Sequence, residues 1–139
     1  MPNLTANDPL VLTEGYYWDL DDQSRPFAKR FMERTGRMPN MVHAGTYSAV
    51  LHYLKAVQAA GTDETEAVVK KMKEMPVDDF FARKGKVLDN GRMVHEMYLF
   101  QVKKPEESKG PWDYYTHLST IPGDQAFATV QESGCMSTH

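Results

Sequence analysis

The longest regular alternation of apolar and polar positions lies between residues 41 and 61. Apolar side chains recur there at the spacing of one helical stripe, at Tyr47, Val50, Leu51, Leu54 and Val57. Gly61 follows the last of them, where helices commonly end in a left-handed residue. The pattern predicts a helix over residues 43–60 whose apolar stripe is buried on a sheet.

Shorter helices are predicted on either side of this one. The first has Ser24 as its N-cap and Pro26 in its first turn, and it ends at Gly36. The other is capped by Asp63 and is ended by Pro76, which cannot continue a helix. The chain is therefore expected to contain about three helices in succession.

Strand signals flank the helical region. Residues 10–13 are short, apolar and β-prone, and the strand is expected to resume at residues 16–18 after a bulge at Gly15. Residues 80–81 and 86–88 are predicted to be extended, and Asp89-Asn90-Gly91 is a hairpin turn signal. Residues 92–103 carry the strongest strand pattern and are apolar on both faces, which is typical of a covered sheet.

The last third of the chain is less regular. Residues 112–115 form a second aromatic run that is expected to be extended, and one helical turn is expected within residues 124–130. This inventory has too much apolar helix surface for the sheet available. We therefore expect the end of a larger α/β domain over residues 10–130, with a disordered lead-in at residues 1–9 and a disordered tail at residues 131–139.

The composition of the chain limits the kinds of partner that it is expected to bind. With 16 basic and 19 acidic residues the net charge is −3, which gives no electrostatic reason to bind nucleic acid. No run approaches the roughly 18 apolar residues that span a bilayer. Residues 1–12 lack the basic and apolar regions of a signal peptide. The chain is expected not to span a membrane. As written, it is also expected not to carry a signal peptide.

A single cysteine, Cys135, lies near the end of the chain. One cysteine excludes an internal disulfide and a cysteine-rich metal site. Two alternatives remain open: a free thiol on a mobile tail, or a disulfide whose partner lies outside this chain.

No arrangement of residues predicts catalysis or a metal site. No two of the five histidines have the i, i+4 spacing of a helical metal site. Ser48 is not in a nucleophile elbow, and no glycine-rich phosphate loop is present. A small enzyme using His43 or His95 is an alternative for which no base, nucleophile and orienting group can be named together. We expect no catalytic residue, no metal and no cofactor.

Several segments, taken in order and with their spacing, resemble one protein family. They include YYWD at 16–19, RPFAKRF at 25–31, AGTYSAV at 44–50, DNGRMVH at 89–95 and QVKKP at 101–105. Together they are similar to the C-terminal portion of ABC transporter substrate-binding proteins of the branched-chain amino acid (Leu/Ile/Val-binding) type, which are periplasmic binding proteins of type I. The resemblance covers about residues 10–135.

The resemblance implies an α/β fold that is a partial type I lobe, with about three helices, a hairpin and hinge strands, which an oligomer would complete. It implies a non-catalytic solute-binding component, or a fragment of one, of an ABC import system for branched-chain amino acids or related small amides and aromatic acids. The implied partners are a small-molecule solute and an ABC permease, and the implied location is the periplasm. The alternative is an oligomeric structural or interaction module that binds no small molecule.

Four aromatic residues are the candidate ligand-binding positions: Tyr16, Tyr17, Trp18 and Tyr47. The resemblance places the first three where the chain passes a hinge, so their rings would line a cleft between two lobes. The alternative for all four is hinge or core packing. Glu14 is a candidate for a ligand ammonium, against the alternative of a solvated carboxylate at a strand end.

The chain also departs from the family pattern. Members of the family are two to three times longer, and the loops that usually grip the ligand are missing here. The resemblance therefore implies an incomplete cleft, and the isolated chain is expected to form a homo-oligomer that covers its apolar surface.

Overall fold

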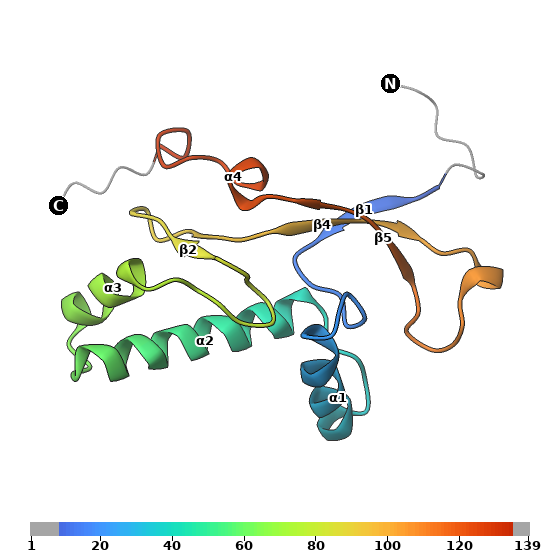
Figure 1. Ribbon diagram of the computed structural model, residues 1–139, viewed down its shortest axis with the longest axis horizontal. Coiled ribbons are helices and arrows are strands. Elements are labelled where there is room, and N and C mark those ends of the chain that lie inside the picture. The colour runs from blue at the N-terminus through green and yellow to red at the C-terminus, as the bar shows by residue number, and fades with distance from the viewer. Residues whose placement is uncertain (1–8, 135–139) are drawn as a thin grey trace.

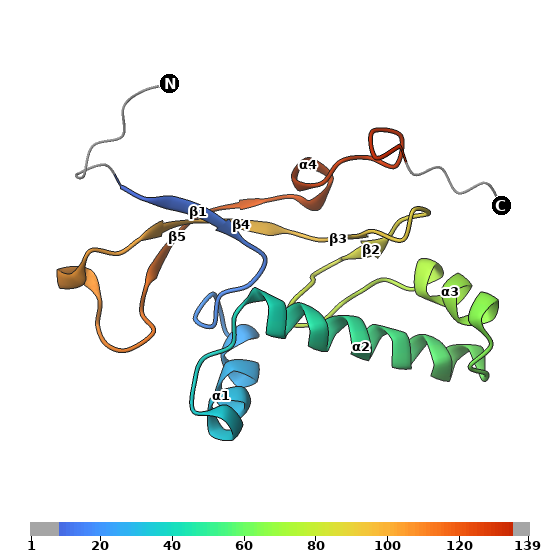
Figure 2. The same ribbon diagram turned by 180° about the vertical axis from the view of Figure 1, so that it is seen from behind.

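The computed structural model describes residues 9–134 (Figure 1). Its main sheet is antiparallel in the order β1 (Val11–Glu14), β4 (Met97–Val102), β5 (Tyr115–Ile121). A separate hairpin pairs β2 (Lys86–Val87) with β3 (Met93–Val94). Helices α1 (Ser24–Thr35), α2 (Met41–Ala60) and α3 (Thr65–Glu74) lie on one side of the strands in both views (Figures 1 and 2). The mixed helix and strand content confirms the predicted α/β class.

Two short elements complete the described part of the chain. The 3-10 helix η1 (Pro105–Glu107) lies in the connection between β4 and β5, and the single turn α4 (Gly123–Ala126) follows β5. The helical turn expected within residues 124–130 is therefore confirmed close to its predicted place. Cys135, the first eight residues and most of the predicted tail lie outside the described residues, so the predictions made for them stay predictions.

Helix α2 begins two residues before the predicted start because Asn40 caps it. The Asn40 side chain accepts hydrogen bonds from the backbone N–H groups of Val42 and His43, at 3.1 and 3.2 Å. In return, His43 Nδ1 accepts the Asn40 N–H at 3.1 Å, which completes a reciprocal capping box. The helix ends at Gly61, whose φ of 69° is the left-handed C-cap that was predicted.

The buried face of α2 is not the predicted one. Tyr47, Val50 and Leu54 are 42%, 53% and 55% exposed. The residues that face the interior are instead small or polar and recur every four positions: Ala44, Ser48, His52 and Ala56. Helix α3 packs on this side, where His52 Nε2 bonds the Met72 carbonyl at 3.0 Å. Of the predicted stripe, Tyr47, Val50 and Leu54 are therefore turned outward, while Leu51 and Val57 are partly buried.

The other two helices start from caps that differ from those predicted. At α1 the N-cap position is Gln23, and the capping carboxylate is that of Asp21, which accepts the Ser24 and Gln23 N–H groups at 2.9 and 3.0 Å. Ser24 itself is the first helical residue. At α3 the cap is Glu64, whose carboxylate accepts two N–H groups, rather than Asp63. The side chains that cap α1 and α3 lie three residues and one residue, respectively, from those predicted. Several neighbouring polar residues in each segment are able to cap a helix.

The strand predictions are partly confirmed. Strand β1 and the hairpin turn at residues 89–91 form as expected, with Gly91 at a φ of 81°. Residues 16–18 do not resume a strand but turn away from the sheet, and residues 80–81 are bends. The long strand predicted at residues 92–103 is interrupted at His95 and Glu96, so β3 and β4 are separate. Strand β5 was anticipated only at its first residue.

The central strand is covered on one face more than on the other. Tyr98 and Phe100 are buried at 3% and 1% exposure, whereas Met97 and Leu99 on the opposite face are only partly covered. Within residues 9–134, the expectation of a sheet covered on both faces is therefore met on one face only.

The buried apolar residues within the described range 9–134 form two clusters, which contain adjacent tyrosines. Tyr16 belongs to the cluster of the helical layer, made of Tyr16, Phe27, Ala44, Val77, Phe81 and Ala82. Tyr17 belongs to the cluster under the sheet, with Tyr98 and Phe100. The segment that follows β1 therefore fixes the sheet against the helices. Across residues 9–134, no helix combines the length and apolar character needed to cross a bilayer.

Candidate functional site

An open hollow of about 390 Å³ lies where three distant segments meet. The first follows β1, the second connects α1 to α2, and the third precedes β5. The lining residues are Glu14, Tyr16, Tyr17, Trp18, Arg37, Met38, Pro39, Asn40, Met41, His43, Trp112, Tyr114 and Tyr115. This lining is mainly aromatic and apolar with a few polar groups, which is typical of small-molecule sites.

Tyr17 and Trp18 both form hydrogen bonds to one backbone carbonyl of the lining segment that precedes β5. The Tyr17 hydroxyl and the Trp18 indole N–H both donate to the Trp112 oxygen, at 3.0 and 2.7 Å. The same hydroxyl accepts the N–H of Tyr114 at 3.0 Å. Trp112 adopts a φ of 71°, a left-handed conformation uncommon for a bulky residue, which these contacts stabilise. Burial raises the pKa of Tyr17, so its hydroxyl is protonated at neutral pH.

Tyr16 lies deeper than its two neighbours. It is 3% exposed, and its hydroxyl donates to the Ser24 carbonyl at 3.1 Å. Its ring meets Phe27 and Phe80 edge-on, at centroid distances of 6.0 and 5.9 Å. Burial, and then the nearby charge of Asp21, raise the pKa of Tyr16 strongly. The polar atoms of Tyr16, Tyr17 and Trp18 thus form hydrogen bonds within the protein. Their aromatic rings are the parts that line the hollow.

Tyr47 does not line this hollow. Its ring packs against Phe27 at 5.3 Å and Phe80 at 5.5 Å and stays 42% exposed. The structure therefore brings together three of the four candidate residues and places Tyr47 apart. The ligand-binding role considered for Tyr47 stays a prediction, and its contacts are those of the packing alternative.

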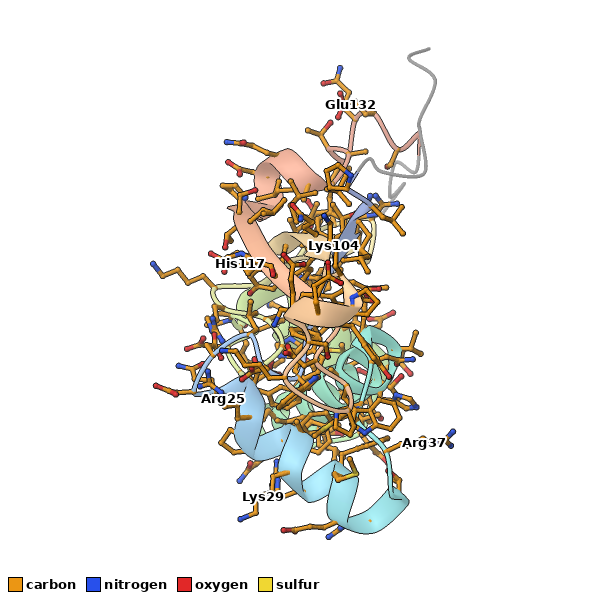
Figure 3. The ribbon with its side chains drawn as sticks, turned by 90° about the vertical axis from the view of Figure 1, so that its right-hand side faces the viewer. Arg25, Lys29, Arg37, Lys104, His117 and Glu132 are labelled. Atoms are coloured by element: carbon orange, nitrogen blue, oxygen red, sulfur yellow. The ribbon has the colours of Figure 1, made fainter. Side chains whose placement is uncertain are left out.

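The charged residues of the lining are Glu14 and Arg37. Glu14 ends β1 opposite Tyr98 and is partly buried, and this burial raises the pKa of its carboxyl. Among residues 9–134, the Glu14 carboxylate has no hydrogen-bond or ion-pair partner. The Arg37 side chain extends away from the body of the molecule (Figure 3). The hollow thus carries one sheltered negative charge and one solvated positive charge.

An ion pair beside the hollow braces the connection between β4 and β5. Lys103 Nζ lies 2.5 Å from Asp113 Oδ1, and Asp113 Oδ2 accepts the Lys109 N–H at 2.8 Å. The hydrogen bond from Lys103 is the main cause that lowers the pKa of Asp113. The loop carrying Trp112 is therefore held from inside by this pair and from the β1 side by Tyr17 and Trp18.

The histidines within residues 9–134 do not together form a second site. His52 is buried and bonded to α3, while His95 packs against Phe81 and Phe127 at 4.7 and 5.1 Å. Burial lowers the pKa of His95. Over the described ranges, no three histidine, cysteine or acidic side chains are grouped as a metal site. A larger hollow of about 500 Å³ lies beyond His95, between the β2–β3 hairpin and α4. It contains none of the four candidate residues.

Sequence reasoning missed part of the lining of the first hollow. His43 and Met41 belong to the first turn of α2, and nothing in the helical pattern marks them as site residues. The aromatic run at residues 112–115 was visible, but no pattern linked it to residues 16–18. One sequence feature could have linked residues 112–115 to residues 16–18: both segments carry clustered aromatic residues at the ends of strands.

Comparison with known proteins gives consistent results. The sequence profile of the family described as "Periplasmic binding protein" matches residues 3–111. A periplasmic binding protein from Burkholderia mallei is 50% identical, with a TM-score of 0.87; the match covers 91% of this chain and 34% of that one. A branched chain amino acid ABC transporter periplasmic ligand-binding protein from Burkholderia xenovorans is 44% identical, with a TM-score of 0.84 and coverages of 88% and 33%.

A more distant structure agrees on the fold alone. An amino acid ABC transporter substrate-binding protein from Pseudomonas fluorescens is 19% identical, with a TM-score of 0.77 and coverages of 92% and 34%. A search of curated proteins finds no match. The chain spans about a third of the length of the structures it matches, so its helices and strands form a partial lobe of the type I fold. The chain belongs to the periplasmic binding protein family.

Proposed function

We propose that this chain provides a cleft wall and hinge strands for the solute-binding component of an ABC import system, without catalytic activity. The proposed solutes are branched-chain amino acids or related small amides and aromatic acids. The 44% identity to a branched chain amino acid ABC transporter periplasmic ligand-binding protein supports this class. An ABC permease is the proposed partner, and the periplasm, where the family acts, is the proposed location.

The observation that carries the proposal is the aromatic hollow at the junction of the two interior clusters. Its three lining segments come from the sheet, from the start of α2 and from the loop before β5. A solute that contacts all three would stabilise one arrangement of sheet, helices and loop. In a protein of this kind, affinity comes from the preference of the solute for such a closed arrangement.

Titration of the isolated chain with leucine, isoleucine, valine and benzoate tests the proposal. We expect weak binding, with dissociation constants of about 1 mM or above, because one wall of a cleft excludes little water from the solute. Amide and indole resonances in NMR spectra report such weak binding, and the Trp18 indole N–H is a direct probe. Shift changes should be confined to residues 14–18, 37–43 and 112–115.

Two outcomes would contradict the proposal. One is the absence of any shift change at the solubility limit of all four solutes. The other is shift changes that cluster at the larger hollow near His95 and Phe127 rather than at the aromatic one. Nanomolar binding by a monomer, measured by calorimetry, would instead show that the cleft is already complete in this chain.

The alternative function, an oligomeric interaction module, is favoured by one observation. The outward stripe of α2 carries large apolar side chains that are 42–55% exposed, at Tyr47, Val50, Tyr53 and Leu54. Apolar surface gathered on one helix face is a common basis for self-association. If this alternative is correct, light scattering should give at least twice the monomer mass.

The matched variant for this experiment is Leu54→Glu, which places a charge in the stripe without touching the interior. It should return the mass to that of a monomer, because burying a carboxylate between two copies is unfavourable. The variant Lys55→Glu, at the next residue, is the control and should leave the mass unchanged. A monomeric wild-type chain would count against the alternative.

A further inference from the structure

Three side chains with metal-binding atoms converge on Gly15, the buried residue that follows β1. The sulfurs of Met41 and Met97 each lie 3.5 Å from the position that a β-carbon would take on Gly15, so they lie within twice that distance of each other. The Cε1 atom of the His95 ring lies 3.0 Å from the same position. Met41 is the first residue of α2 and Met97 the first residue of β4, while His95 lies in the break between β3 and β4.

The hydrogen bonding of His95 leaves one ring nitrogen able to bind a metal. Its Nδ1 atom lies 2.7 Å from the Glu96 carbonyl oxygen, which can only accept, so Nδ1 carries the proton and donates. Burial lowers the pKa of His95, which keeps the ring neutral and leaves a lone pair on Nε2. Among residues 9–134, Nε2 has no hydrogen-bond partner. Metal-binding histidines commonly donate one N–H to a backbone carbonyl in this way and bind the metal through the other nitrogen.

The two methionines combine a fixed position with some freedom to adjust. The Met41 sulfur accepts the Gly15 N–H at 3.2 Å, which holds it beside the end of β1 and leaves a second lone pair. Both methionines are partly buried. Methionine side chains are unbranched and have three rotatable bonds, so small rotations are sufficient to bring both sulfurs to one ion.

The donor atoms and the nearby charges indicate which metal fits. Thioether sulfurs are soft ligands that select Cu(I), whereas magnesium and calcium prefer oxygen ligands. The charges of Asp79 and Glu96 both act to raise the pKa of His95, against the larger effect of burial, so they favour a cation near its ring. Arg83 lines the same hollow of about 500 Å³ as His95 but is paired with Asp21. That open hollow gives an ion a route from solvent.

We infer that Met41, His95 and Met97 form a Cu(I) site where the end of β1 meets the starts of α2 and β4. The inference goes beyond the proposed function and does not depend on it, because no solute takes part. The bound ion would link the break between β3 and β4 to the first turn of α2.

Anaerobic titration of Cu(I) in competition with the coloured chelator bathocuproine disulfonate tests the inference. The full chain is used with Cys135→Ser in every sample, because the Cys135 thiolate is itself a soft ligand for Cu(I). We expect one Cu(I) ion to bind per chain, and excess zinc should not displace it, because zinc in proteins is bound by thiolate, imidazole and carboxylate rather than by thioether.

The variants Met41→Leu and Met97→Leu each remove one sulfur and nearly conserve the volume of the side chain. Each should weaken Cu(I) binding by roughly tenfold or more, and the double variant should lose it. Met72→Leu, in α3, is the matched control and should bind Cu(I) as the Cys135→Ser chain does. NMR spectra give a second test without these variants: Cu(I) should shift the His95 Nε2 resonance and the methyl resonances of the two methionines.

Several results would overturn the inference. They are the absence of Cu(I) binding by the Cys135→Ser chain, Cu(I) binding that persists in the double variant, and zinc binding as tight as that of Cu(I). NMR shifts confined to residues other than these three ligands and their neighbours would overturn it as well. None of these results bears on the proposed function, whose solutes are titrated without metal.

Discussion

Replacement of Phe100 by alanine is expected to lower the free energy of unfolding by about 4 kcal/mol. Phe100 is 1% exposed in the middle of the central strand, and its ring contacts Tyr17 and Tyr115 at 5.4 and 5.7 Å. Truncation removes the burial of an aromatic ring and leaves a cavity between the sheet and the segment that follows β1. Urea denaturation followed by tryptophan fluorescence measures the loss as a shift of the transition midpoint.

The control for this experiment is Leu118→Ala on the neighbouring strand. Leu118 is 47% exposed, so its truncation should cost less than about 1 kcal/mol. Because Phe100 supports Tyr17, its loss should also broaden the resonances of the Trp112 loop. Equal losses for the two variants would show that the cluster under the sheet does not stabilise the chain.

Replacement of Asp79 by alanine is expected to cost about 3 kcal/mol. The Asp79 carboxylate accepts the Ser48 hydroxyl at 2.7 Å and the N–H groups of Phe81 and Ala82 at 2.8 and 2.9 Å. Ser48 is fully buried in α2, so the variant leaves a buried hydroxyl and two turn N–H groups without their acceptor. The same urea denaturation experiment measures this loss.

Asp78 offers a matched comparison one residue away. It is exposed, and Asp78→Ala should change the free energy of unfolding by no more than about 0.5 kcal/mol. Asp79→Asn keeps one acceptor oxygen and should fall between the two. If Asp79→Ala were as stable as Asp78→Ala, the bend at residues 79–81 would not depend on this side chain.

Local signals in the sequence were sufficient to predict the helices and the hairpin. Gly36, Gly61 and the Asp89-Asn90-Gly91 turn end or reverse the chain through their own conformational preferences, whatever surrounds them. Strand β5 was largely missed because a strand whose side chains are exposed on both faces lacks the period-two alternation that marks strands. Its pairing with β4 is decided by tertiary contacts.

The orientation of α2 could not be predicted for a related reason. Periodicity shows that a helix has two faces, but the larger apolar face is buried only if a partner is present to cover it. In the described residues, α3 and the bend at residues 79–81 pack against the small face around Ser48. The hydrogen bonds of Ser48 and His52 then fix that choice.

The lining of the candidate hollow was predictable in part. The aromatic run at residues 16–18 was identified, and the structure places all three residues in the lining of the hollow. The resemblance suggested their location near a hinge, but the grip on the Trp112 carbonyl depends on a left-handed residue 94 positions away from Trp18. A bulky residue in that conformation has no sequence signature.

The placement of Tyr16 and Tyr17 in different interior clusters has a mechanical consequence. Neighbouring side chains leave the backbone in different directions, so a rotation that withdraws one ring also displaces the other. The Tyr16–Tyr17 peptide bond is thus one point at which the sheet and the helical layer are linked. A displacement of the sheet relative to the helical layer would therefore disturb the packing of both rings at once.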